Sequence, residues 1–133
     1  MANTLSALIQ ADHREFRRMF SELRLPATRP LIAPMLMALL GAHARSEEAH
    51  VYPALRERAG APDAVEHSQE EHVEADRLAA QLAETALDDP KFDDLLEKLV
   101  DSVSHHLEEE EETVLPKLDK LSDDEQHSIA EAF

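Results

Sequence analysis

The sequence contains no cysteine, which excludes disulfide bonds, thiolate metal ligands and cysteine nucleophiles. It also has only two glycines and no tryptophan, whereas alanine, leucine and glutamate recur throughout. Because these three residues favour helix over strand, the composition predicts an all-α protein. A chain of 133 residues is long enough to bury a core, so we expect a single domain over residues 1–133.

A long apolar run is also missing. The longest nearly apolar stretch, from Pro30 to Ala42, is too short to cross a bilayer and is expected to form a buried helix. The N-terminus has neither the basic start nor the small-residue cleavage site of a secretion signal. These features predict a cytoplasmic protein with no membrane partner.

Basic residues are scarce, and the formal net charge is −16. The excess is uneven, since residues 1–60 carry a balance of +2 and residues 61–133 a balance of −18. A surface this acidic repels the phosphates of nucleic acids. We therefore expect no nucleic acid partner.

Prolines and capping residues divide the chain into four long segments. The expected helices run from Asn3 or Thr4 to about Leu25, from about Leu31 to Gly60, from Pro62 to about Asp88, and onward from a cap at Asp89. Short connections between long helices favour an up-down-up-down four-helix bundle. The capping-box pattern Ser122-Asp-Asp-Glu125 adds a short C-terminal helix.

The chain also repeats itself. The segment from His43 to Leu55 aligns without gaps on the segment from His106 to Leu118, with His, two Glu, Val, Pro and Leu at the same offsets. A shorter pair, Asp12-His13 and Glu71-His72, lies upstream of each copy. The sequence therefore predicts two helical hairpins of one design, each offering one His and then His-x-x-x-Glu.

Six side chains of this repeat are expected to meet in one buried layer. Residues four apart share a helix face, so each His-x-x-x-Glu pair points one way, on an apolar stripe. Residues of an antiparallel hairpin are level when their midpoint falls at the turn. The midpoints are 28 for His13 and His43, 89 for His72 and His106, and 59.5 for Glu47 and His72, and all fall at expected turns.

Buried carboxylates with no Lys or Arg in their layer are normally bound to metal. The predicted ligands are His13, His43, Glu47, His72, His106 and Glu110. Imidazole and carboxylate without thiolate suit Fe, Zn or Mn. Two sets of His, His and Glu predict two ions, with iron as the expected metal and with glutamates able to bridge them.

The remaining histidines, the tyrosine and two prolines of the repeat are assigned smaller roles. His50 is a candidate further ligand, or a residue that supports one. Tyr52 is expected to pack in the core, with a hydrogen bond near the site as the alternative, and Pro53 and Pro116 are expected to kink or end their helices. The remaining histidines, His67, His105 and His127, are expected at the surface.

Over roughly residues 5–118 this pattern resembles the hemerythrin-like HHE cation-binding domain. The motif residues are His13, His43 with Glu47 and Tyr52-Pro53, Glu71-His72, and His106 with Glu110 and Pro116. The resemblance implies a di-iron bundle concerned with O₂, peroxide, nitric oxide or iron sensing. Oxygen-carrying hemerythrins use a His-x-x-x-His pair on the third helix, where this chain has Ser68. That difference favours a catalase-like or sensor role over O₂ transport.

Two other functions remain open at this point. The chain could be a helical interaction module whose metal is structural. A ferritin-like iron-oxidising site is less favoured because it needs Glu-x-x-His on two helices. Glu47 and His50 have that spacing, but Val103 and Gln69 stand three before His106 and His72.

Overall fold

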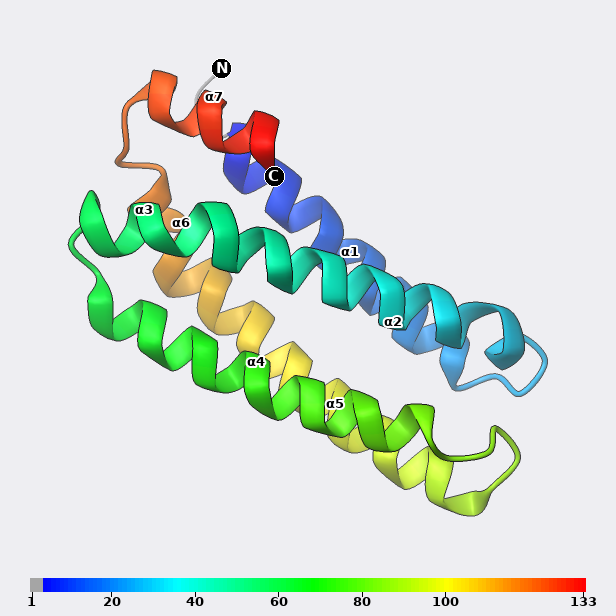
Figure 1. Ribbon diagram of the computed structural model, residues 1–133. Coiled ribbons are helices and arrows are strands. Elements are labelled where there is room, and N and C mark those ends of the chain that lie inside the picture. The colour runs from blue at the N-terminus through cyan, green and yellow to red at the C-terminus, as the bar shows by residue number, and fades with distance from the viewer. Residues whose placement is uncertain (1–3) are drawn as a thin grey trace.

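The computed structural model describes residues 4–133, and its elements are helical (Figure 1). No strand occurs within this range. The helices are α1 (Thr4–Leu23), α2 (Arg29–Ser46), α3 (Tyr52–Glu57), α4 (Pro62–Ala83), α5 (Pro90–Glu109), α6 (Leu115–Leu118) and α7 (Asp123–Ala132). Two π-helical segments, η1 (Glu47–Val51) and η2 (Glu110–Val114), join α2 to α3 and α5 to α6.

These elements form four antiparallel rods (Figure 1). The first is α1, the second runs through α2, η1 and α3, the third is α4, and the fourth runs through α5, η2 and α6. The short helix α7 packs against α1 at the end of the bundle where both chain termini lie (Figure 1). The predicted all-α, up-down-up-down bundle with a short C-terminal helix is confirmed.

Several helix boundaries follow from side-chain chemistry. The Asp89 carboxylate accepts a hydrogen bond from the Lys91 N–H, and Ser122 Oγ accepts one from Glu125, so both predicted caps form. The first helix ends at Leu23 and the second begins at Arg29, each two residues before the expected position. The cap alternative Asn3 lies outside the described residues.

The third helix ends at Ala83, earlier than the expected Asp88. Thr85 Oγ1 donates to the carbonyl of Gln81 at 2.8 Å, which competes with the backbone bonds that would continue the helix. Gly60, with φ of 64°, forms the tight connection before α4, in a conformation that other residues rarely adopt.

Pro53 and Pro116 each lie just after a π-helical segment. In η1 the Tyr52 N–H donates to the carbonyl of Glu47, five residues back, and in η2 the Leu115 N–H donates likewise to Glu110. Proline has no N–H and its ring clashes with the preceding turn. The wider π turn just before each proline accommodates it, so the rods continue past Pro53 and Pro116.

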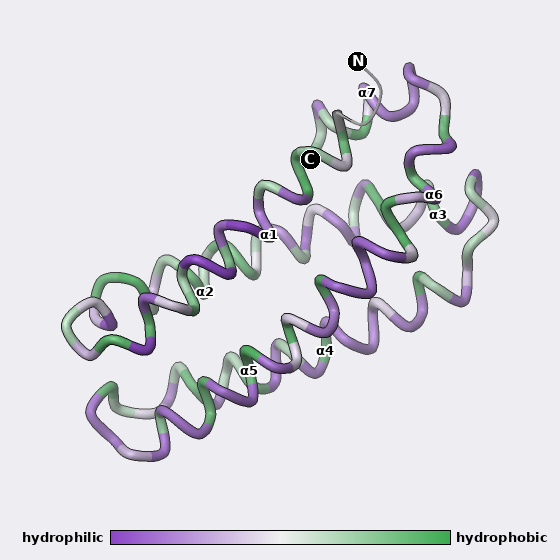
Figure 2. Tube along the Cα trace, turned by 180° about the vertical axis from the view of Figure 1, so that it is seen from behind, coloured by the Kyte–Doolittle hydropathy of each residue, from purple (hydrophilic) through white to green (hydrophobic). Residues whose placement is uncertain are grey.

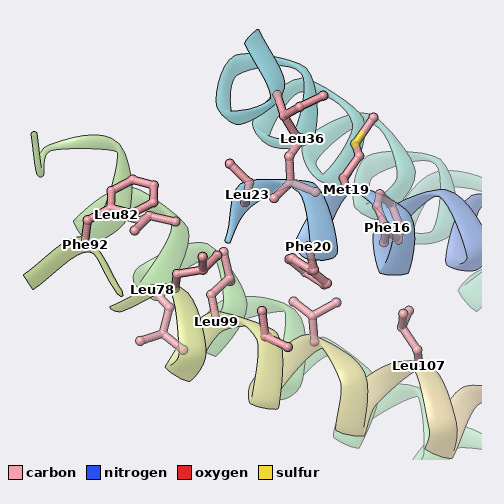
Figure 3. Packing of buried hydrophobic residues seen from close by; sticks show 14 residues of the cluster. Phe16, Met19, Phe20, Leu23, Leu36, Leu78, Leu82, Phe92, Leu99 and Leu107 are labelled. Carbon is pink, nitrogen blue, oxygen red and sulfur yellow. The ribbon is translucent and has the colours of Figure 1, made fainter. Parts of the chain in front are cut away.

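The hydrophobic core consists of two clusters. The larger, around Phe16, Phe20, Leu99 and Leu107, fills the half of the bundle near the α1–α2 and α4–α5 turns (Figure 3). The smaller, around Ile9, fills the half near α7. Figure 2 shows hydrophobic positions recurring between hydrophilic ones along the long helices, as one buried face per helix requires. None of the helices within residues 4–133 combines the length and apolarity that a bilayer crossing would need.

Candidate metal centre

Four histidines from four helices meet between the two hydrophobic clusters. His13 comes from α1, His43 from α2, His72 from α4 and His106 from α5. Their exposed fractions are 0%, 6%, 9% and 7%, so all four imidazoles are buried. They occupy the single layer that the hairpin midpoints predicted.

Two buried carboxylates complete this layer. Glu47 and Glu110 are each the first residue of a π segment and are 0% and 1% exposed. The side chains form two clusters whose potential ligand atoms lie within 4.8 Å of one another. The first contains His13, His43 and Glu110, and the second contains Glu47, His72 and His106.

Each carboxylate therefore crosses from its own hairpin to the other. Glu110 Oε1 lies 3.2 Å from His13 Nε2, and Glu47 Oε1 lies 3.2 Å from His72 Nε2. Each also stays near the histidine four residues before it, since the distances from Nε2 are 3.3 Å for His43 and Glu47 and 3.3 Å for His106 and Glu110. Both carboxylates therefore face imidazoles of both clusters.

Each of the four buried imidazoles also contacts a further carboxylate on its side away from the centre. In each case Nδ1 donates to the outer group, which leaves Nε2 directed at the centre. The four bonds are His13 to Glu111 at 2.8 Å, His43 to Asp12 at 2.7 Å, His72 to Glu48 at 3.2 Å and His106 to Glu71 at 2.9 Å. Such carboxylate–histidine pairs fix the tautomer and orientation of metal-binding imidazoles.

The contacts repeat with an approximate two-fold symmetry. A shift of 59 residues relates α1 to α4, and a shift of 63 relates the second rod to the fourth. Under these shifts the contact of Asp12 with His43 becomes that of Glu71 with His106. The contact of Glu48 with His72 likewise becomes that of Glu111 with His13. The sequence repeat is thus a repeat of the site.

Tyr52 breaks this symmetry. Its hydroxyl lies 3.1 Å from His72 Nε2, 3.3 Å from Glu110 Oε2 and 3.4 Å from Glu47 Oε1. Tyr52 packs in the smaller core cluster, as expected, and its hydroxyl also makes the hydrogen bond at the site that was the alternative. The symmetry-related residue is Leu115, which has no polar group. Burial and the charges of Glu47 and Glu110 raise the pKa of Tyr52, so its hydroxyl keeps its proton.

The titration behaviour of the layer reflects its crowded carboxylates. Burial by itself lowers the pKa of His43, but the hydrogen bond to Asp12 and the nearby carboxylate of Glu47 raise it to about 10. His106 reaches about 10 in the same way, through Glu110 and Glu71. Burial raises the pKa of Glu110, yet its hydrogen-bond partners hold it well below the usual value. Protons on His43 and His106 therefore compensate part of the buried negative charge when no cation does.

The donor set fits a bound cation. His43 Nε2 and Glu47 Oε2 are fully buried, point into the layer and have no hydrogen-bond partner. Among residues 4–133 the buried Lys or Arg is Arg29, and its guanidinium bonds to groups at the turn end of the bundle, Leu23, Leu87 and Asp93. Unpaired buried polar atoms with no basic residue beside them are what a metal ion would satisfy.

The structure brings together all six residues that the sequence singled out. His50 is exposed and belongs to neither buried cluster, so its proposed part in the site is corrected. His67, His105 and His127 are exposed, as expected. The sequence did not assign roles to the outer carboxylates Asp12, Glu48, Glu71 and Glu111. Their signal was present, because each is next to a predicted ligand within the repeat.

A cavity connects the layer to the outside. It has a volume of about 260 Å³ and reaches His43, His72 and His106 between α2 and α4. Apart from these imidazoles and Asp76 its walls are apolar, with alanines and Gly41 forming much of the lining. The cavity thus offers small molecules a mainly apolar route to the layer, with Asp76 as the carboxylate in its lining.

These features define a class of protein: an antiparallel helical bundle with a paired histidine–carboxylate cation site in its interior. Residues 4–118 match the family described as Hemerythrin HHE cation binding domain. The chain therefore belongs to the hemerythrin HHE cation-binding family, as the motif predicted.

Comparison with curated proteins adds one distant relative. A protein of Nostoc sp. (strain PCC 7120 / SAG 25.82 / UTEX 2576) named "DNA nickase" is 29% identical over 130 residues. The match covers 95% of this chain but 37% of that relative, so the chain spans little more than a third of its length. No solved structure matches the chain.

Proposed function

We propose that the chain is a non-haem di-iron protein that binds or reacts with O₂, peroxide or nitric oxide, in sensing or detoxification. The observation that carries this proposal is the pair of crossed clusters, in which each buried glutamate faces imidazoles of both hairpins. Six protein side chains shared between two ions leave coordination positions for a small molecule. Nitrogen and oxygen donors without sulfur suit iron, with zinc or manganese as alternatives.

Bound iron would supply the redox chemistry and the open positions for a small ligand. The chain's own residues do the rest. The outer carboxylates hold each imidazole with Nε2 facing inward. The Tyr52 hydroxyl keeps a proton within 3.1 Å of His72 Nε2, where it can donate a hydrogen bond to a molecule held beside the second cluster.

The apolar cavity supports a small uncharged ligand. Its volume of about 260 Å³ accommodates a diatomic molecule or peroxide, and its walls offer few polar partners to anything larger. Walls of this kind also limit the access of bulk water, which protects reactive species from side reactions.

The alternatives fare differently. A ferritin-like site would need His50 beside Glu47, but His50 is exposed. A structural metal in an interaction module remains the competing proposal, and reactivity separates the two. The nickase name of the Nostoc protein suggests DNA as a substrate, but a net charge of −16 opposes contact with phosphates, so we propose a small-molecule partner and no nucleic acid.

Iron-loaded protein tests the proposal directly. Elemental analysis should find two iron ions per chain, with ligand-to-iron absorption in the near ultraviolet that changes on addition of peroxide or nitric oxide. Glu110→Gln should abolish both signals, because Glu110 faces both clusters. His127→Gln, an exposed change on α7, serves as the control. Absence of bound transition metal after growth in iron-rich medium would overturn the proposal, and bound metal with an unresponsive spectrum would favour the structural role.

A further inference from the structure

A third histidine–carboxylate cluster, separate from the two buried ones, lies on the outer face of α4 and α5. His67 and Glu71 are four apart on α4, and His105 and Glu109 are four apart on α5. Each pair therefore presents an imidazole and a carboxylate on one helix face. The side chains of His67 and His105 are 55% and 63% exposed, so ions in solution can reach the cluster.

Three of the four side chains, those of His67, Glu71 and Glu109, offer ligand atoms that all lie within 4.8 Å of one another, and His105 faces the same two carboxylates from α5. His67 Nε2 lies 2.7 Å from Glu109 Oε2 and 3.5 Å from Glu71 Oε2. His105 Nε2 lies 3.0 Å from Glu109 Oε1 and 3.6 Å from Glu71 Oε2. Both imidazoles thus face both carboxylates, which two independent surface ion pairs would not do.

These distances suit a small divalent cation. A tetrahedral zinc site with bonds of about 2.0–2.1 Å places its ligand atoms about 3.3 Å apart. The two distances to Glu71 are already close to that value. The two shorter distances to Glu109 are a hydrogen bond from His67 and a close contact of His105, and both would open by a few tenths of an ångström around a bound cation. A hollow of about 280 Å³, lined in part by His67, Ser68 and Glu109, leaves room beside the cluster for a water ligand.

The buried centre does not require this cluster. Under the approximate two-fold symmetry, Glu71 corresponds to Asp12, which also holds an inner imidazole. The residues related to His67, His105 and Glu109 are Leu8, Ala42 and Ser46, which offer no imidazole or carboxylate. The α1–α2 hairpin therefore orients His43 without such additional side chains, whereas the α4–α5 hairpin has them.

We propose that His67, Glu71, His105 and Glu109 form a surface site for a divalent transition cation such as Zn²⁺, distinct from the buried centre. Two imidazoles with two carboxylates are a zinc-type ligand set. Glu71 also joins the two sites, because its Oε1 accepts from His106 Nδ1 while its Oε2 faces the surface imidazoles. The surface site stands on its own residues and does not depend on the proposed iron chemistry.

The chain contains a matched control. His127 and Glu131 have the same spacing, are exposed and lie 3.0 Å apart on α7, but no second pair converges on them. If a lone His-x-x-x-Glu pair sufficed for the binding, removing His127 would affect it as much as removing His67. The proposed site predicts that removing His67 or His105 weakens zinc binding, whereas removing His127 does not.

The experiment is calorimetric titration of the iron-loaded protein with Zn²⁺ at about pH 8, above the ordinary imidazole pKa of about 6.5. We expect one zinc equivalent that His67→Ala or His105→Ala weakens about tenfold or more, the scale on which metal-site residues act. His127→Ala should leave it unchanged, and iron analysis before and after should show that zinc has not replaced iron. Superimposable titrations of wild type, His67→Ala and His105→Ala would overturn the proposal.

The outcomes separate the two sites. A protein that binds no iron but loses a zinc equivalent in His67→Ala refutes the di-iron function and keeps the surface site. Normal iron content with superimposable zinc titrations refutes the surface site and keeps the di-iron function. Both substitutions are at exposed positions, and circular dichroism of the variants would verify that they fold.

Discussion

Raising the pH should destabilise the metal-free protein steeply. In the folded state the carboxylates around His43 and His106 raise both pKa values to about 10, from 6.5 for an ordinary imidazole. A group with a raised folded-state pKa contributes stability that is complete below the unfolded value and is lost as pH rises through the folded value. The window is therefore about pH 6.5 to 10. Glu110, whose pKa is lowered, acts on the other side, since its contribution is lost as pH falls below about 4.5.

The magnitude follows from linkage. Each pKa unit is worth about 1.4 kcal/mol, so a shift from 6.5 to about 10 corresponds to at most about 5 kcal/mol for each histidine. Both titrating together would remove about 2–3 kcal/mol per pH unit. With an m-value of about 1–3 kcal/mol/M, the urea midpoint should fall by about 1–3 M per pH unit. Domains of this size are stable by about 5–15 kcal/mol, so the loss is large.

The assay is urea unfolding of chelator-treated protein at several values between pH 6.5 and 8.5, followed by circular dichroism. His43→Gln removes one of the two titrating groups and should roughly halve the slope. Metal-loaded protein should show the opposite trend, because bound imidazoles are deprotonated and lose their metal as pH falls. A midpoint of the metal-free protein that stays constant or rises over this range would refute the reasoning.

Three substitutions test other parts of the site, and a DNA-binding assay tests the acidic surface. Asp12→Asn and Glu71→Gln should weaken iron binding to a similar extent, about 10–100-fold in a competition assay with a chelator, because the two residues hold symmetry-related imidazoles. Tyr52→Phe should retain both ions but alter the optical spectrum and any peroxide reactivity, since only the hydroxyl is lost. Duplex DNA at about 0.1 M salt should show no mobility shift with the protein, and a salt-sensitive shift would contradict the expected repulsion.

The sequence predicted the layer because the layer depends on regular geometry. Helix periodicity aligned His43 with Glu47, and the turn positions made His13 and His43 level. The crossing of the carboxylates was not predictable in this way. Whether Glu110 lies nearer to His106 or to His13 depends on side-chain rotamers and on how closely the two hairpins approach. The spacing of residues along the sequence determines neither.

The sequence left the role of Tyr52 open for a different reason. In a regular α-helix a residue five positions after Glu47 lies about 140° away around the axis. The π turn changes this, because the Tyr52 N–H bonds to the carbonyl five residues back and so places Tyr52 one turn above Glu47. Pro53 indicated a disturbance at this point, but a proline specifies neither a kink nor a π turn by itself.

The departures from symmetry indicate that the two clusters are chemically different. The second cluster has the Tyr52 hydroxyl, whereas His43 of the first packs edge-on against Phe16 and Phe133, at 5.2 and 5.4 Å between ring centroids. Ser68, four before His72, is buried, and its counterpart Ile9 is apolar. Polar, proton-bearing groups thus gather around one cluster and aromatic carbon around the other. If a small molecule binds as proposed, this arrangement would favour the side of Glu47, His72 and His106, where the Tyr52 hydroxyl could donate a hydrogen bond to it.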